Sequence, residues 1–250
     1  MEVKAEKIKP YDNERGKAEQ VEQMFDSISG AYDLMNRAMT LGIDKLWRRR
    51  AVRLVRDAAP ALVADLATGT GDLAIALARQ IPHAEVAGYD LSEGMLAVGR
   101  AKVAKAGLAH RISLTQADCL SLPAADCSAD AVTVAYGVRN FEHLDLGYRE
   151  MLRILRPGGL LCVVELSTPR GPVTGPLYRL YTRRIVPAIG RLVSHDSRAY
   201  SYLPESIAAV PQGQLMCDLM AEAGFTDCHF RPMTFGSCTI YTAYKPIESL

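Results

Sequence analysis

Short apolar runs alternate along this 250-residue chain with segments in which apolar residues recur three and four positions apart. The runs are typical of buried strands, and the segments between them are typical of amphipathic helices. Strand and helix alternate five times, which predicts a mostly parallel, doubly wound α/β sheet. The five predicted strands are 62–66, 86–90, 112–116, 131–135 and 160–166.

The pattern changes near the C-terminus. A helix is predicted over 215–223, and Gly224 is placed to end it in a left-handed conformation. Two alternating segments, 225–231 and 237–245, follow it without an intervening helix. They predict a closing hairpin, and therefore a seven-stranded sheet with an antiparallel C-terminal edge.

Two helical regions precede the first strand. One begins near Val21, and the other runs over 44–58 with a predicted buried side of Leu46, Trp47, Val52, Leu54 and Val55. Arg48, Arg49, Arg50 and Arg53 lie around the rest of that helix, either as a solvated face or with one of them reaching a carboxylate of a bound cofactor. Residues 1–19 are polar and mixed in charge, and predict a poorly ordered tail.

Composition divides the chain into four segments of what is predicted to be one domain. Prolines and tyrosines gather after Glu165, where an insertion of short helices over the strand ends is expected. The segments are an N-terminal tail and helices (1–59), a nucleotide-binding core (60–166), a helical lid (167–212) and a closing helix and hairpin (213–250).

Charge and cysteine usage exclude several classes of protein. A formal net charge of +1 gives no basic footprint for nucleic acid. No apolar run approaches the roughly 18 residues of a membrane-spanning helix, and the charged N-terminus is unlike a secretion signal. The six cysteines lack metal-finger spacing and are expected to be reduced thiols, so no metal is predicted and a cytoplasmic location is expected.

The strongest local signal is a turn with two glycines, Gly69-Thr70-Gly71, between the first strand and a helix. Such a turn lets backbone approach a ligand, and Asp90 at the end of the second strand is placed to bind a ribose. The spacing also fits a dinucleotide fingerprint, so a nicotinamide enzyme is a competing interpretation. Asp65 and Asp72 add negative charge where a diphosphate would lie, and they favour an adenosine ligand with a cationic tail, S-adenosylmethionine.

Taken together, several runs make the chain resemble the ubiquinone/menaquinone biosynthesis C-methyltransferases, a family of class I enzymes that use S-adenosylmethionine. The resemblance covers nearly the whole chain after residue 20. Its most specific runs are Gly137-Val138-Arg139-Asn140 and Tyr200 to Ile207, whereas Pro157-Gly158-Gly159 occurs in many methyltransferases. It implies the class I S-adenosylmethionine-dependent methyltransferase fold.

The resemblance also implies which residues bind the cofactor. Thr70, Asp90 and the pair Asp118-Cys119 are expected to contact it directly. Position 135 is often serine in relatives and is alanine here, so a side-chain hydrogen bond to the cofactor is lost and only the backbone of Ala135 is expected to contact it. The expected neighbours are Tyr32, Asp65, Gly69, Gly71, Leu91 and Ala135.

The implied reaction is C-methylation of a prenylated quinol. Arg139 is the first choice for a catalytic role, as a group that orients a water or stabilises a developing phenolate, because its high pKa makes it a poor base. A structural ion pair is the alternative for this arginine. Asn140 and Tyr200 are expected to bind the substrate, and His195 and Asp196 are further acid–base candidates.

The acceptor and the partners are left more open. Demethylmenaquinol is the preferred acceptor, with a polyprenyl benzoquinol or a non-catalytic scaffold of a quinone-synthesis assembly as alternatives. Residues 177–193 hold four arginines and no acids among apolar residues, which suits either contact with the inner face of a membrane or a solvated lid. A homodimer is also an open expectation.

Overall fold

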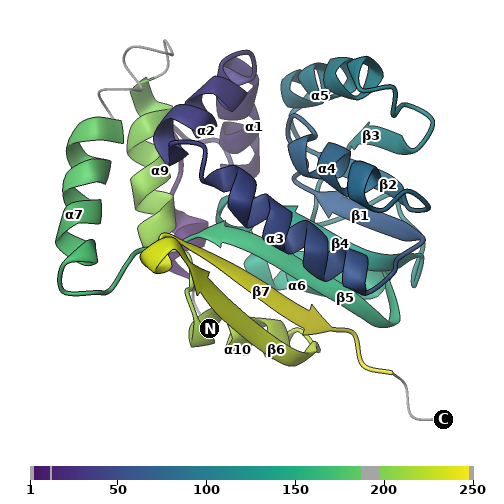
Figure 1. Ribbon diagram of the computed structural model, residues 1–250. Coiled ribbons are helices and arrows are strands. Elements are labelled where there is room, and N and C mark those ends of the chain that lie inside the picture. The colour runs from purple at the N-terminus through teal and green to yellow at the C-terminus, as the bar shows by residue number, and fades with distance from the viewer. Residues whose placement is uncertain (1–2, 12, 187–196, 248–250) are drawn as a thin grey trace.

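A computed structural model describes residues 3–11, 13–186 and 197–247. Its centre is a seven-stranded sheet in the order β3-β2-β1-β4-β5-β7-β6 (Figure 1). Strands β1 to β5 are mutually parallel, and β7 is antiparallel to both β5 and β6. The strands are β1 (Leu62–Leu66), β2 (Glu85–Asp90), β3 (Ile112–Gln116), β4 (Ala129–Ala135), β5 (Leu155–Leu166), β6 (Thr226–Met233) and β7 (Cys238–Tyr244).

This topology confirms the predicted mostly parallel sheet with an antiparallel C-terminal hairpin. The last strand in sequence, β7, lies between β5 and β6, and its pairing runs from Leu160 opposite Tyr244 to Leu166 opposite Cys238. A plain dinucleotide-binding domain continues its sheet with a parallel strand at this position. The inserted strand therefore weighs against the nicotinamide interpretation.

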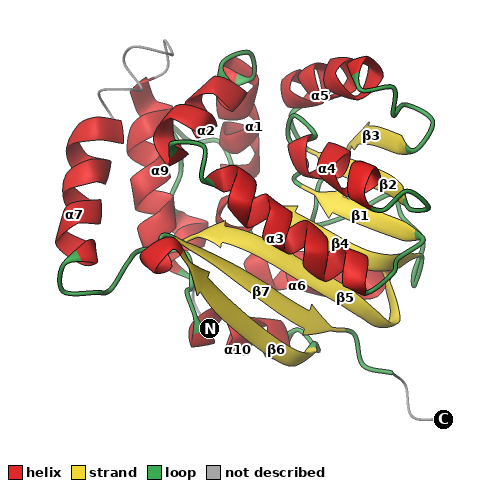
Figure 2. Cartoon of the chain, viewed as in Figure 1, coloured by secondary structure: helices red, strands yellow, loops and turns green. Residues whose placement is uncertain are grey.

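Helices cover both faces of the sheet (Figure 2). One face packs against α3 (Asp44–Asp57), α4 (Asp72–Gln80) and α5 (Glu93–Lys105). The other packs against α6 (Leu144–Ile154) and α10 (Gln214–Glu222). Because both faces are buried, the central strands are apolar on both sides: Leu161 and Val163 face α6 and α10, whereas Cys162 and Val164 belong to the opposite cluster.

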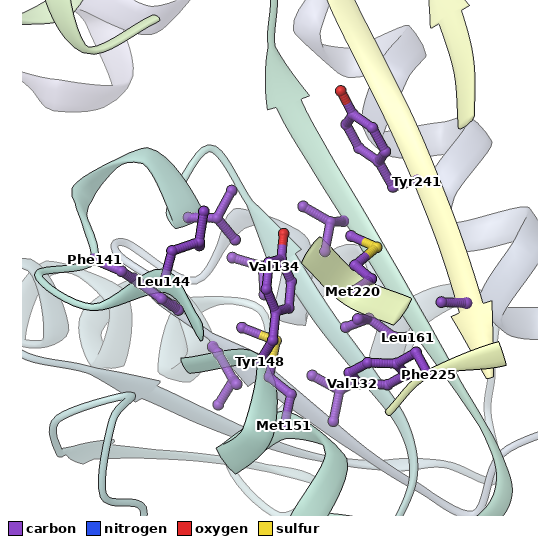
Figure 3. Packing of buried hydrophobic residues seen from close by; sticks show 14 of the residues in the cluster. Val132, Val134, Phe141, Leu144, Tyr148, Met151, Leu161, Met220, Phe225 and Tyr241 are labelled. Atoms are coloured by element: carbon purple, nitrogen blue, oxygen red, sulfur yellow. The ribbon is translucent and has the colours of Figure 1, made fainter. Parts of the chain in front are cut away.

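The layer beneath α6 and α10 is the larger hydrophobic cluster (Figure 3). Tyr148 and Met151 of α6 are fully buried against Val132 and Val134 of β4. The Tyr148 hydroxyl donates to the sulfur of Met216 at 3.0 Å, so this deep ring is not left with an unpaired polar group. This packing holds β4 and β5 in place, and with them the carboxyl ends of the two strands.

A third layer of helices lies over the carboxyl ends of the parallel strands. It consists of α1 (Lys17–Ile28), α2 (Tyr32–Thr40) and α9 (Ser197–Ala209), with α7 (Thr174–Leu180) at the outer edge (Figure 1). A separate cluster of Val21, Met24, Ile28, Met35 and Tyr202 holds α1, α2 and α9 together. We call these three helices the helical cover.

Two expectations from the sequence need correction. The N-terminal segment is not a loose tail, because Val3 and Ala5 are buried around a short 3-10 helix, Lys4–Lys7. Leu46 is 57% exposed, since Ala51 rather than Leu46 continues the buried stripe of Trp47, Val52 and Val55.

Two further points concern β5 and the lid. Residues 156–159, which include the Pro157-Gly158-Gly159 run, belong to β5, where the pairing with β4 jumps from Leu155 to Leu160. The lid candidates His195 and Asp196 lie outside the described residues. Within the part of the chain that is described, no helix has both the length and the apolar character needed to span a membrane.

Candidate functional site

The site is built on the turn after β1. Gly69 and Gly71 have φ values of +56° and +75°, a left-handed conformation that glycine adopts without strain. The Gly69 N–H donates to Asp90 Oδ2 at 2.7 Å, and the Ser92 N–H donates to Asp90 Oδ1 at 2.9 Å. The carboxylate at the end of β2 is thereby locked against the glycine turn. Burial nevertheless raises the pKa of Asp90 to about 6.

A first pocket opens beside Asp90, between the sheet edge and the helical cover. It brings together most of the predicted cofactor residues on elements far apart in sequence. Val21 and Phe25 of α1 and Met95 of α5 supply apolar walls. The predicted residues that line it are Tyr32, Gly69, Asp90, Leu91, Asp118, Cys119, Ala135 and Asn140.

A second, smaller pocket lies next to it and shares Tyr32, Gly69 and Ala135 with the first. Asp65 and Thr70 line this second pocket, together with Arg48 of α3. Gly71 lines neither pocket, and its contribution is the positive φ that begins α4. All the other predicted cofactor residues line at least one of the two.

The polar partners of these residues refine their expected roles. Asp65 was expected to face an ammonium, but Thr68 and Thr133 each donate a hydroxyl to it at 2.6 Å, so both of its oxygens already accept hydrogen bonds. Burial raises its pKa to about 6. Asp118 lines the first pocket and also accepts the Leu120 N–H at 2.9 Å, a hydrogen bond that is typical of an aspartate in a turn.

Two carboxylates tie the helical cover to the core beside the site. Asp33 of α2 accepts the Thr70 hydroxyl at 2.6 Å and the Lys102 ammonium at 2.6 Å. Asp26 of α1 accepts the Ser92 hydroxyl at 2.5 Å and the Gly94 N–H at 2.9 Å, at the start of α5. Thr70 is therefore held from the side of α2, a contact that the sequence did not predict.

Of the five arginines on α3, Arg48 is the one that lines a pocket of the site. Its side chain is 12% exposed and lies 3.3 Å from Asp72, and it also pairs with Asp44. Arg49 and Arg53 are exposed, as expected for a solvated face. Arg48 is the basic side chain of the second pocket, and helical spacing alone did not distinguish it from its neighbours.

A third cavity, of about 480 Å³, continues from Tyr32 and Tyr136 away from the sheet. Its lining is mostly apolar and includes Trp47, Leu177 and Tyr178. Tyr136 lines all three spaces, and its buried hydroxyl has no hydrogen-bond partner among the described residues. Tyr32 and Tyr136 thus form a wall that the two small pockets share with the large apolar cavity.

Arg139 lies in the wall of this cavity with its side chain 6% exposed. Its Nη1 donates to Glu165 Oε1 at 2.8 Å and to the Tyr136 carbonyl, while its buried Nε has no partner in the described part of the chain. The ion pair considered as the alternative to catalysis is thus present. The guanidinium therefore keeps one N–H that no described residue accepts, so the ion pair does not use all of its donors.

Of the two predicted substrate residues, the structure describes the side chain of Asn140 but not that of Tyr200. The Tyr202 hydroxyl donates to Asn140 Oδ1 at 3.1 Å, and Tyr202 is buried in the helical cover. Tyr200 lies in α9, but its side chain is not among those described. Sequence reasoning missed Tyr202, although it lies in the run Tyr200 to Ile207 that carried the resemblance, and it missed Glu165, which no run of the resemblance includes.

Comparisons with known proteins agree with this arrangement. The chain is 48% identical to a demethylmenaquinone methyltransferase of Bacteroides fragilis over 98% of its length and 100% of the relative. It is 46% identical to a Porphyromonas gingivalis protein of the same name, with coverage of 96% and 98%. A solved methyltransferase of Thermotoga maritima, described as a possible histamine N-methyltransferase, shares the fold.

That structural likeness has a TM-score of 0.63 at 17% identity and covers 90% of this chain and 99% of the other. It speaks for the fold alone. A family model described as the ubiE/COQ5 methyltransferase family matches residues 13–245. Because that match spans nearly the whole chain and includes both the pockets and the arginine of the cavity wall, the chain belongs to the ubiE/COQ5 methyltransferase family.

Proposed function

We propose that this protein uses S-adenosylmethionine to methylate a ring carbon of a reduced demethylmenaquinone. The observation that carries the proposal is that Tyr32 and Tyr136 line two small pockets with carboxylates and also a large apolar cavity. The binding places of a small charged donor and a long apolar acceptor are therefore adjacent at these two side chains. The names of the relatives at 46–48% identity supply the acceptor.

The two pockets fit the two halves of the cofactor. Asp90 offers a carboxylate at a strand end, the usual acceptor for ribose hydroxyls, beside apolar walls suited to adenine. The second pocket offers Arg48 to a carboxylate, and the buried Tyr136 hydroxyl supplies an unused polar group beside it. When bound, the cofactor supplies an electrophilic methyl group on a sulfonium.

The chain's own residues then have to orient an electron-rich ring. The ring carbon forms the new C–C bond as the methyl–sulfur bond breaks, and its proton leaves to solvent, so the reaction needs no oxidant. Tyr32 and Tyr136 bound the junction, and the apolar cavity holds the prenyl chain. Holding the carbon in line with the methyl group can supply much of the rate enhancement.

Arg139 is placed to stabilise the quinol oxygen as it gains negative charge. Its guanidinium is fixed through Nη1 by Glu165 and the Tyr136 carbonyl, so the donors that remain for a quinol oxygen are on its other two nitrogens. Asn140 is fixed in turn by the Tyr202 hydroxyl. Donors held in advance by the protein act without reorganising during the reaction, and such preorganisation is what makes them effective.

A methyl-transfer assay tests the proposal. Purified protein is incubated with S-adenosylmethionine and chemically reduced demethylmenaquinone. After reoxidation, mass spectrometry is expected to detect menaquinone, which is heavier than the starting quinone by one CH₂, about 14 Da. The oxidised quinone is the control and should not react, because its ring is electron-poor. Exclusive turnover of a polyprenyl benzoquinol would contradict the proposed acceptor.

Cofactor affinity is expected to fall when the pH is lowered through about 6, the pKa to which burial raises Asp90. Ribose hydroxyls donate to the ionised carboxylate, whereas the protonated form of Asp90 is a weaker acceptor at this position. Calorimetric titration of S-adenosylhomocysteine between pH 5 and 8 measures the effect. In Asp90→Asn the affinity should be low throughout and this pH dependence should be lost; the same slope in that variant would assign the titration to another group.

The role of Arg139 is best tested without leaving a buried charge. Removing one partner of a buried pair costs about 3–5 kcal/mol, so Arg139→Ala would confuse folding with catalysis. In Arg139→Gln/Glu165→Gln both partners become neutral. We expect kcat to fall by about 10²–10³-fold, the range for loss of one preorganised donor, with cofactor affinity nearly unchanged by calorimetry. Wild-type kcat in the folded double variant would remove Arg139 from the mechanism.

We also propose that the face around α7 rests on an anionic membrane, from which the prenylated substrate enters the cavity. Leu177, Leu180 and Ile185 line the cavity and are 46–64% exposed, and Arg179 and Arg184 are exposed beside them. The described lid residues 167–186 contain no acid. An exposed apolar rim flanked by arginines suits an anionic bilayer surface.

Vesicle binding checks this contact. Leu177→Ser/Leu180→Ser is expected to weaken co-sedimentation with phosphatidylglycerol vesicles and to raise KM for a long-chain quinol in vesicles, but not for a short-chain quinol in solution. The matched control is Leu146→Ser/Leu215→Ser, at leucines of similar exposure on α6 and α10. Equal binding of both variants and wild type would exclude the α7 face.

A further inference from the structure

Lys17, at the start of α1, is a fully buried lysine that none of the three pockets contains. It is 0% exposed, and its ammonium donates to three backbone carbonyls. These are Ala5 O at 2.7 Å, Phe141 O at 3.0 Å and Arg139 O at 3.1 Å. An ammonium has three protons, so the three acceptors match its full donor capacity.

Two of these carbonyls belong to the segment that carries the proposed catalytic groups. Arg139 and Phe141 stand on either side of Asn140, so the ammonium clamps the backbone around that residue. The clamp continues along the chain, because the Lys17 N–H donates to Glu142 Oε1 at 2.9 Å and Glu6 accepts the Leu144 N–H at 2.8 Å. The N-terminal segment 3–11 and 13–17 is thus bonded to residues 139–144 at several points.

We infer that Lys17 is a positioning residue for the methyl transfer, fixing the backbone of residues 139–141 so that Arg139 and Asn140 point into the site. This inference rests on the proposed function of those two residues. Glu165 and Tyr202 hold the two side chains from one side, and Lys17 holds the backbone from the other. A charged group is suited to this because charge-assisted hydrogen bonds are stronger than neutral ones.

The surroundings of Lys17 make this clamp sensitive to alkaline pH. Desolvation by burial lowers the pKa of Lys17 to about 8. The nearby carboxylates of Glu6 and Glu142 raise the pKa in opposition, and the charge of Arg139 lowers it slightly further. Those three are the charged groups that face it, from the N-terminal 3-10 helix, the loop before α6 and the segment 138–140. Above this pKa the folded protein loses one proton from Lys17, and the neutral amine has only two donors for three carbonyls.

The sign of the stability effect separates positioning from simple stabilisation. The pKa of Lys17 is lower in the folded than in the unfolded chain, so the unfolded chain binds more protons between about pH 8 and 10.5. Folding stability contributed by this group therefore rises with pH in that window. Loosening of residues 139–141 should instead make activity fall over the same range, so the two readouts move in opposite directions.

Lys17→Met tests the inference, with Lys4→Met as the matched control on an exposed lysine of the same segment. In the methyl-transfer assay, Lys17→Met is expected to lose at least tenfold in kcat, with a smaller change in the KM for quinol. Amide hydrogen exchange of residues 139–142 should become faster by a similar factor. Lys4→Met should match wild type in both measurements. Wild-type kcat in folded Lys17→Met would overturn the inference.

The wild-type pH profile covers the case in which Lys17→Met does not fold. Protection factors of the 139–142 amides, which are corrected for intrinsic exchange, should fall as the pH rises through about 8, and kcat should fall with them. Lys17→Arg stays charged and should lack this decline. Constant protection of these amides in wild type from pH 7 to 9.5 would overturn the inference. Failure of the proposed function is distinguishable, because Arg139→Gln/Glu165→Gln would then also retain full activity.

Discussion

The buried ion pair between Arg139 and Glu165 joins the sheet to the chemistry of the site. Glu165 is near the end of β5, where a carboxylate 2% exposed in its side chain requires a partner. Arg139 supplies that partner from the short helix after β4, at 2.8 Å. The pair therefore fixes the guanidinium relative to the neighbouring parallel strands β4 and β5. The guanidinium in turn donates to the Tyr136 carbonyl, and the pair holds the segment 138–141, which includes Asn140, beside the sheet.

The helical cover turns an ordinary strand-end crevice into an enclosed site. Asp26 and Asp33 bond α1 and α2 to the beginning of α5 and to the glycine turn. This attachment also positions Tyr32, because Tyr32 lies one residue before Asp33. Tyr32 lines every pocket described above. The two small pockets, which contain Asp65 and Asp90, thus share the Tyr32–Tyr136 wall with the large apolar cavity, an arrangement that suits a reaction between a cationic donor and a lipid-like acceptor.

The fold and the family carry different kinds of information about function. The sheet order is shared with a methyltransferase at 17% identity, and such a likeness fixes the fold without fixing the substrate. The apolar cavity, the arginine in its wall and the ion pair behind that arginine are features of the site itself. They are what connect the family to a large, electron-rich acceptor, and the N-terminal segment belongs to the same site through Lys17.

The sequence by itself determined the alternation of strand and helix, the glycine turn with Asp90, and the closing hairpin, because these depend on local periodicity and on the special backbone freedom of glycine. It also singled out Arg139 and Asn140 as candidates through their run of residues, and their roles stay a prediction. Contacts between distant segments were decided only by the tertiary structure. Lys17 falls in the predicted polar tail, and Arg48 is one of several similar arginines on its helix. Glu165 carries no local signal, and Tyr202 lies in a run from which only Tyr200 was singled out. Each of these four side chains contacts a partner that is distant in the sequence and lies in another element. No local pattern encodes which distant groups will be buried together in the low-dielectric interior of the protein.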